Sequence, residues 1–418
     1  MADSTRALGI DFGTSNSAAG YLDGDQIRLI GFGGQPTLPT TFFFNFDTRQ
    51  TLLGEPANRA LLDGEEGRFM RALKRVLGTS LMHEKRQILN ERVTFVDIIA
   101  RFLNHIKTRA EAETGHRFTH ALSGRPVVFH GTNDAREQQA EDDLRACYLA
   151  AGFTDVEFMA EPQAAAIASG TTGKLDEIGL IVDIGGGTSD FSLFRSTDTG
   201  IDILANHGVR IGGTDFDRAL SFARVMPLLG RGTHLRDAFG PGTNPAPNAI
   251  FLDLATWEKI PFLYTQQNRR KVDDMLSLAE DPGKFSRLAS VLQDELGHEV
   301  AFEVERGKIA ANNHDANAQI DLSVIERALS LPLHANDLNA LLTDHAQNLH
   351  DGIAETLRLA QLSGDQVNHV IYVGGSSLLS MVSATARAAL PNASHSFSEA
   401  FTGVVNGLAR ASATLNND

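Results

Sequence analysis

The sequence predicts an α/β protein of two or more domains that carries the same kind of glycine-rich hairpin twice. Strands alternate with helices along all 418 residues, which is typical of α/β folds. A motif of strand, acid, glycine turn with hydroxyls and returning strand occurs twice, in Ala7–Leu22 and in Leu180–Phe194. The chain is also too long for a single compact core, so we expect two or more domains.

The composition is that of a globular protein with an acidic balance. Apolar residues make up 42% and charged residues 21%, and no window reaches the ~20 apolar residues of a membrane span. The net charge of −15 argues against a nucleic-acid partner, which would favour a basic face. Cys147 is the only cysteine, so the chain forms no internal disulfide. The first strand starts too close to Met1 for a signal peptide. We therefore expect a cytoplasmic protein without membrane or nucleic-acid partners.

The hairpin in Leu180–Phe194 turns through three consecutive glycines, which are Gly185, Gly186 and Gly187. Such a turn lets the backbone approach a bulky ligand, and its N–H groups form a nest for anionic oxygens. Thr188 adds a hydroxyl donor. Asp183 and Asp190 flank the turn and would repel a phosphate unless a cation lies between them, which indicates Mg²⁺. From this stretch alone, a solvated hairpin turn is an equally good interpretation.

The second copy of the motif makes the interpretation more specific. Near the N-terminus the acid, the glycine and the two hydroxyls are Asp11, Gly13, Thr14 and Ser15. They align in order with the acid, the glycine run and the hydroxyls of the other hairpin. Two such hairpins facing each other could hold a polyphosphate from both sides.

The segment between the hairpins supplies two further candidates. Its expected elements are strands at Ile27–Phe32, Leu38–Phe46, His120–His130 and Val156–Ala160, and helices at Arg68–Gly78, Thr94–Glu113 and Arg136–Gly152. Lys74 falls in the last turn of the first helix, where it could simply complement the helix dipole. Glu161 and Pro162 open an alanine-rich helix, so Glu161 either caps this helix or orients a water or a metal ligand.

After the second hairpin, two more glycine–hydroxyl segments precede helices. Gly212, Gly213 and Thr214 offer free N–H groups to an anion, or form an N-cap with Asp215. A strand at His369–Val373 leads into Gly374, Gly375, Ser376 and Ser377, followed by a helix at Leu379–Ala389. The other expected elements are a loop at Gly230–Asn248 and helices at Ala255–Tyr264, Gln266–Glu280, Lys284–Asn312, Leu338–Leu362 and Ala400–Leu415.

Taken in order, these motifs resemble the nucleotide-binding domain of DnaK-type heat-shock chaperones, and most of all the short YegD-like homologues. The matching stretches are Asp11-x-Gly13-Thr14, Lys74-Arg75-x-x-Gly78, Glu161-Pro162, Asp183-x-Gly185-Gly186-Gly187-Thr188-x-Asp190, Gly212-Gly213-x-Asp215 and Gly374-Gly375-Ser376. The resemblance implies an actin-like ATPase fold, with ribonuclease H-like duplicated lobes around a central nucleotide cleft. Lobe I would span 1–174, with 396–418 packing back on it. Lobe II would span 175–395, including a helical subdomain at about 216–315.

The resemblance also implies ATP or ADP with Mg²⁺ as ligands. Asp11, Asp183 and Asp190 would hold Mg²⁺, largely through its waters. Lys74 would reach the γ-phosphate and Glu161 would orient the attacking water. The phosphates would be lined by Gly13, Thr14, Ser15, Gly185, Gly186, Gly187, Thr188, Gly212, Gly213 and Thr214. The nucleoside side would be contacted by Glu305, Lys308, Asn312, Gly374, Gly375, Ser376 and Ser377.

Two features depart from the chaperone pattern. Ile309 and Leu378 stand where the chaperones place two arginines around adenine, so the choice of base is open. The chain also ends soon after its last helix, so we expect no peptide-binding domain. The resulting hypothesis is a nucleotide-dependent switch with slow ATP hydrolysis and an unknown protein partner or client. The alternatives are a phosphotransferase of the sugar-kinase type and an MreB-like filament-forming ATPase.

Overall fold

The computed structural model describes residues 6–130, 134–169, 175–197, 201–237, 240–397 and 402–416. The chain divides into two compact units. The first comprises Met1–Arg210, Leu349–Leu378 and Thr385–Asp418, and the second comprises Ile211–Asn348 and Leu379–Ala384. The lobe boundary expected at 174/175 lies at the edge of a segment outside the described residues, so the division into lobes stays a prediction. The helical segment expected at 216–315 lies inside the second unit.

Two sheets of the first unit share one strand order. In the first sheet the order is β11-β10-β1-β2-β3, and in the second it is β20-β19-β12-β13-β14. In each sheet the central strand pairs antiparallel with the strand that follows it and parallel with a strand from later in the chain. This repetition confirms the α/β class and the duplicated architecture that the sequence predicts. The bounds are β1 (Arg6–Phe12), β2 (Asn16–Asp23), β3 (Gln26–Leu29), β10 (Phe118–Arg125), β11 (Asp155–Ala160), β12 (Ile178–Ile184), β13 (Ser189–Ser196), β14 (Ile201–Val209), β19 (His369–Val373) and β20 (Ser394–Phe397).

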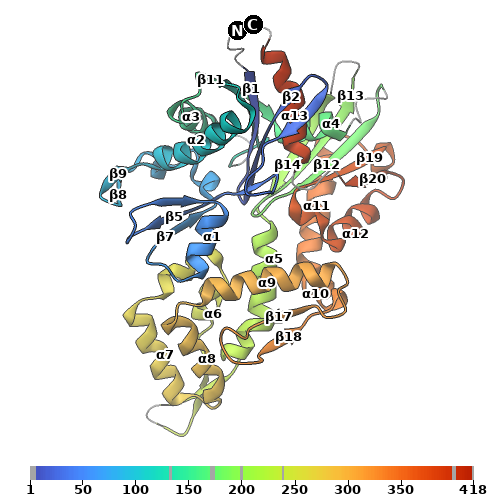
Figure 1. Ribbon diagram of the computed structural model, residues 1–418. Coiled ribbons are helices and arrows are strands. Elements are labelled where there is room, and N and C mark those ends of the chain that lie inside the picture. The colour runs from blue at the N-terminus through green and yellow to red at the C-terminus, as the bar shows by residue number, and fades with distance from the viewer. Residues whose placement is uncertain are drawn as a thin grey trace. The chain divides into compact units, whose positions relative to one another are not determined.

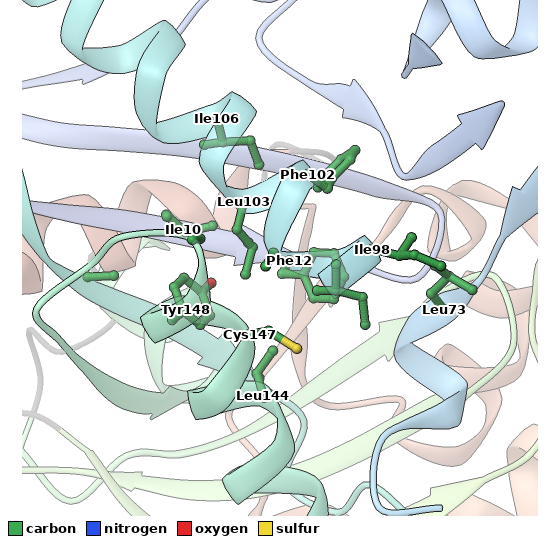
Figure 2. Packing of buried hydrophobic residues seen from close by; sticks show 14 of the residues in the cluster. Ile10, Phe12, Leu73, Ile98, Phe102, Leu103, Ile106, Leu144, Cys147 and Tyr148 are labelled. Atoms are coloured by element: carbon green, nitrogen blue, oxygen red, sulfur yellow. The ribbon is translucent and has the colours of Figure 1, made fainter. Parts of the chain in front are cut away.

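Helices α2 (Phe95–Thr114) and α3 (Arg136–Ala150) cover the first sheet (Figure 1). Thr94 caps α2 in a reciprocal capping box with Asp97, as expected for a helix that starts at this point. The core between the helices and the sheet is apolar and fully packed around Phe12, Phe102 and Tyr148 (Figure 2). Cys147 of α3 lies in the same core as a buried thiol.

A second core joins both sheets through α4 (Glu161–Ser169) and α13 (Gly403–Ala411). Its buried members come from both sheets and both helices, namely Leu122, Ala164, Ala165, Ala166, Ile181, Phe194, Ile371, Val373, Val404 and Leu408. The two helices approach so closely that a Cβ on Gly407 would lie 1.8 Å from the Ala164 carbonyl oxygen. Small residues at this crossing allow the close approach of the two helices. They therefore help to position α4 and its first residue, Glu161.

The prediction of a helix at Arg68–Gly78 is wrong. The structure forms β7 (Gly67–Arg71), which pairs with β5 (Thr41–Asn45), and then a 3-10 helix at Leu73–Val76. Pairing with the buried phenylalanines of β5 satisfies the backbone of β7, and this tertiary contact outweighs the helical periodicity of a short stretch. Ala72 makes the junction with a left-handed backbone, at φ 59°.

The second unit is mostly helical. Its helices are α5 (Gly213–Leu220), α6 (Asn248–Leu254), α7 (Gln266–Leu278), α8 (Pro282–Gln293), α9 (Gly297–Asn312) and α10 (Ala335–Leu341), with a π-helical turn at Ser221–Val225 and 3-10 helices at Met226–Leu229 and Trp257–Leu263. Helices α7 and α8 lie side by side (Figure 1). The predicted helix at Lys284–Asn312 is divided in two, because Glu295 adopts a left-handed conformation (φ 57°) between α8 and α9. The expected loop at Gly230–Asn248 contains a short hairpin of β15 (His234–Arg236) and β16 (Thr243–Pro245).

The remaining elements are short or connect the two units. They are β4 (Leu38–Pro39), β6 (Thr51–Leu53), α1 (Glu55–Leu62), β8 (Arg86–Ile88), β9 (Glu91–Val93), β17 (Gln319–Asp321), β18 (Ser330–Pro332), α11 (Thr343–Ala360) and α12 (Ser380–Ala389), with 3-10 helices at Ser80–His83, Gly364–Gln366, Gly375–Leu378 and Ser412–Asn416. The predicted helix at Leu338–Leu362 is thus interrupted at Leu342, between α10 and α11. Among the helices described, none has the length and apolarity needed to cross a bilayer.

Candidate functional site

The turns of the two repeated hairpins touch each other in the first unit. One turn joins β1 to β2 through Gly13–Ser15, and the other joins β12 to β13 through Gly185–Thr188. The Gly185 N–H donates to the Thr188 carbonyl at 3.0 Å and closes the second turn. A Cβ on Gly186 would lie 2.3 Å from the Ser15 hydroxyl oxygen. The backbone at Gly186 therefore lies directly against the Ser15 side chain, and this contact brings together two motifs that are far apart in the sequence.

Three half-buried carboxylates lie at the ends of the strands that carry these turns. Asp183 and Asp190 are directly opposite each other across the β12–β13 pair, an unfavourable position for two like charges. Each lies against a glycine: a Cβ on Gly374 would be 2.8 Å from Asp183 Oδ1, and one on Gly208 would be 2.9 Å from Asp190 Oδ1. Asp11 is the penultimate residue of β1, the corresponding strand of the first sheet. Glycine at both positions therefore makes room for the oxygens of Asp183 and Asp190.

The pKa values of these three carboxylates are raised, first by burial and then by neighbouring negative charges. Burial, with the charge of Glu161 added, raises the pKa of Asp11 to about 7 and that of Asp190 to about 7. Burial followed by the charges of Glu161, Asp190 and Asp11 raises the pKa of Asp183 well above its usual value. A cation placed among them would favour their charged forms and release protons.

Lys74 and Glu161 form an ion pair beside these acids. Lys74 Nζ donates to Glu161 Oε1 at 2.6 Å, and their side chains are only 9% and 16% exposed. Burial lowers the pKa of Lys74, but the carboxylates of Glu161, Asp11 and Asp183 outweigh it, and the pKa is raised overall. Lys74 therefore keeps its charge at neutral pH.

Short backbone segments position the side chains of Glu161 and Lys74. Glu161 is the first residue of α4 and follows β11 directly, and its Cγ lies close to Gly124 at the end of β10. Lys74 stands on the 3-10 helix that follows the left-handed Ala72. A left-handed conformation is costly for alanine, and such residues gather at functional sites.

Arg75 is a site residue that the sequence analysis did not single out. A Cβ on Gly187 would lie 1.5 Å from Arg75 Nη2, so the guanidinium group lies directly against the glycine turn. The position adds positive charge to a nest of backbone N–H groups. The sequence contains Arg75 in the matching stretch Lys74-Arg75-x-x-Gly78, but no role was predicted for its side chain.

The segment Gly374–Ser377 also belongs to the first unit. Gly374 has φ 81°, and its Cα packs against the end of β12, where a Cβ would lie 2.4 Å from the Ile184 carbonyl oxygen. The Ser377 hydroxyl donates back to the Gly374 carbonyl at 2.7 Å and is buried. Ser376 is half-buried, and Leu378 is 44% exposed. Of the two serines, Ser376 is therefore the better placed to meet a ligand.

The residues predicted to contact the nucleoside from α9, which are Glu305, Lys308 and Asn312, belong to the second unit. Lys308 Nζ is 2.8 Å from Asp217 Oδ1 and is nearly buried. Asn312 Oδ1 accepts from the Ser380 N–H at 2.8 Å. Glu305 is half-buried and Ile309 is 50% exposed. The nucleoside contacts of Glu305, Lys308 and Asn312 stay predictions.

Gly212–Thr214 behaves in the structure as the start of a helix. The Gly212 N–H donates to Asp215 Oδ2 at 3.1 Å, and α5 begins at Gly213. This is the capping arrangement that the sequence left open beside an anion site. The role of Gly213 and Thr214 toward phosphate stays a prediction.

The described part of the chain contains no group of three or more histidine, cysteine, aspartate or glutamate side chains that could together hold a metal ion directly. The role expected of Asp11, Asp183 and Asp190 is different, because they would contact the metal largely through its waters. That expectation stays a prediction, and the raised pKa values of the three carboxylates fit it.

Two sheets of one strand order, each ending a central strand in an acid and a glycine–hydroxyl turn, define the actin-like ATPase fold. The family model described as Hsp70 protein matches residues 7–223, which is more than half of the chain. The protein therefore belongs to the Hsp70 family. Among similar proteins are the chaperone protein DnaK of Endomicrobium trichonymphae, 35% identical over 224 residues, and that of Ureaplasma urealyticum serovar 10, 33% identical over 217 residues. Each match covers 51% of this chain and 34% of the relative's length.

Proposed function

We propose that the protein binds ATP with Mg²⁺, hydrolyses it slowly, and changes conformation with the nucleotide it holds. The observation that carries this proposal is the buried Lys74–Glu161 pair beside three crowded carboxylates and two touching glycine turns. Membership of the Hsp70 family, and relatives named as chaperones, support an ATP-binding function related to chaperones. The slow rate and the switching are our extension of that function.

The residues present fit a nucleotide with its metal ion. The turns at Gly13–Ser15 and Gly185–Thr188 supply N–H and hydroxyl donors to phosphate oxygens. Asp11, Asp183 and Asp190 would hold Mg²⁺ through its waters, and their repulsion in the free protein is what such a cation relieves. When bound, Mg²⁺ would neutralise part of the charge on the phosphate oxygens.

The side chains of the site would then position and polarise rather than form covalent bonds. Lys74 is charged and held, so its ammonium group can stabilise charge that develops on the transferred phosphoryl group. Glu161 lies at 2.6 Å from that ammonium, where it can orient a water for attack. Thr188 hydrogen-bonds Asp190, which ties the second turn to its acid.

The experiment is single-turnover hydrolysis of labelled ATP by the purified chain, with and without Mg²⁺. We expect slow, Mg²⁺-dependent release of ADP and phosphate, and no turnover in excess chelator. A chain that binds no Mg·ATP would refute the proposal. ADP release stimulated by a sugar would favour the phosphotransferase alternative instead, and an ATP-dependent rise in light scattering would favour filament assembly.

The same assay tests which nucleotide base the protein prefers. Comparing ATP with GTP tests whether Ile309 and Leu378, in place of arginines, relax the selectivity for adenine.

We propose that an unidentified protein client or partner responds to the nucleotide state. A cytoplasmic location remains a prediction from the composition.

A further inference from the structure

The loop that carries Lys74 is fastened at its far end by a buried carboxylate of α3. Asp143 is 1% exposed, and its Oδ2 accepts from the Gly78 N–H at 2.8 Å. Its Oδ1 lies 2.9 Å from His83 Nε2 and accepts from Gln139 Nε2 at 2.8 Å. The carboxylate therefore ties two points of the loop, Gly78 and His83, to the middle of a long helix.

A second contact fastens the same turn from another direction. His130 Nε2 donates to the Leu77 carbonyl at 2.6 Å. Gly78 has φ 74°, and a Cβ there would lie 2.7 Å from the Arg136 carbonyl oxygen and 2.8 Å from His130 Nε2. The backbone at Gly78 is thus held from both sides, in a place that accepts only glycine.

The loop needs such anchors because its own secondary structure is weak. Lys74 stands on a 3-10 helix of four residues between the left-handed Ala72 and Gly78. Short 3-10 segments have poor hydrogen-bond geometry and do not fix a side chain by themselves. Leu73 and Leu77 are buried in the core that also holds Leu144 of α3 (Figure 2). Apolar packing of Leu73 and Leu77 holds the loop against the core. The hydrogen bonds from Gly78 and His83 to Asp143 fix the position of its backbone beyond Lys74.

We propose that Asp143 is a positioning residue for Lys74, acting through Gly78 and His83 on the reaction proposed above. It lies on α3 and touches neither Lys74 nor Glu161 in the contacts described. The inference rests on the proposed function. A displacement of a reacting group by about 1 Å can lower a rate by as much as 100-fold, so a loosened loop should act on hydrolysis more than on binding.

The test compares Asp143→Ala, which removes all three acceptor contacts, with Asp143→Asn, which keeps one amide oxygen as an acceptor. We expect single-turnover hydrolysis to fall by about 10- to 100-fold in Asp143→Ala and by less in Asp143→Asn. The dissociation constant for Mg·ATP should change by less than about threefold. Hydrogen exchange at the Gly78 amide should accelerate in both variants.

Two controls separate positioning from loss of stability. Asp142→Ala changes the exposed neighbour of Asp143 on the same helix and should match the wild type in rate. Val156→Ala makes a cavity in the same core on β11, outside the hydrogen bonds that hold Leu77, Gly78 and His83, and should lower the free energy of unfolding without the loss of rate. An Asp143→Ala rate within twofold of wild type would overturn the inference. So would equal losses of binding and rate, or the same rate loss in Val156→Ala. If the wild type itself hydrolyses no ATP, the proposed function fails and the positioning role fails with it.

Discussion

Replacing Lys74 by alanine is the sharpest perturbation of the site. The change removes one cation from among four carboxylates: Glu161, its direct partner, and Asp11, Asp183 and Asp190. If Lys74 stabilises charge that develops during phosphoryl transfer, its loss should slow hydrolysis far more than it weakens ATP binding. If it only balances the resting carboxylates, binding and hydrolysis should fall together.

The structure sets the scale of the effect. At the Nζ–Oε1 distance of 2.6 Å the Coulomb attraction is about 6 kcal/mol for an effective dielectric constant of ~20. Desolvation of both ions offsets most of it, so the net contribution of the pair to folding is small. A preorganised charge of this kind typically contributes about 2.7–4 kcal/mol to a transition state. We therefore expect hydrolysis to fall by about 100- to 1,000-fold.

Removing Lys74 also leaves Glu161 without its partner. Breaking a buried ion pair usually costs about 3–5 kcal/mol of stability. Here the cost should be smaller, because Asp11 and Asp190 have pKa values of about 7 and can take up protons in response. The variant should thus fold at pH 7 and be most destabilised at higher pH, where proton uptake is unfavourable.

The assay is single-turnover hydrolysis beside calorimetric titration with Mg·ATP. Lys85→Ala is the matched control, because Lys85 is exposed and lies a short distance along the chain. Lys74→Arg keeps the charge but changes its shape, so it should recover binding more fully than rate. Equal losses in rate and affinity for Lys74→Ala would refute the reasoning, as would a rate unchanged from wild type.

Two further predictions concern the carboxylates. In the nucleotide-free protein the folded state binds more protons than the unfolded state between about pH 4 and 7, since Asp11 and Asp190 titrate near 7 rather than near 3.8. Stability to urea should therefore fall as pH rises through this window, and a rise would contradict the assignment. Asp183→Asn removes the like-charge pair with Asp190, so without Mg²⁺ it should gain about 1 kcal/mol of stability at pH 8. Thermal unfolding should also show that Mg·ATP stabilises this variant less than wild type, and an undiminished effect would exclude Asp183 from the metal's surroundings.

The repeated hairpins could be predicted from the sequence because their information is local. An acid, a glycine turn and hydroxyls follow one another within a few residues, and Asp183 and Asp190 are brought opposite by the hairpin itself. The duplicated strand order then follows from the two copies of the motif. The capped helix at α2 was equally readable, since Thr94 and Asp97 are three residues apart.

The surroundings of Lys74 could not be predicted in this way. Its partner Glu161 is 87 residues away, and the strand that replaces the expected helix exists because Arg68–Arg71 meets β5. Asp143 is 65 residues from Gly78, and nothing in its helix distinguishes it from its exposed neighbour Asp142. Arg75 is identified only by its contact with Gly187. These features depend on which elements meet in the fold, and no local pattern encodes that.

The most direct test of a nucleotide site built around these carboxylates is calorimetric titration of the wild-type chain with Mg·ATP at pH 7. The titration is repeated in buffers of different ionisation enthalpy. Because burial and the neighbouring charge of Glu161 raise the pKa of Asp11 and of Asp190 to about 7, these acids hold protons in the free protein that a bound cation would displace. We predict that Mg·ATP binds with release of protons from these carboxylates, seen as a heat that varies with the buffer. Absence of binding, or binding whose heat is the same in every buffer, would contradict the account.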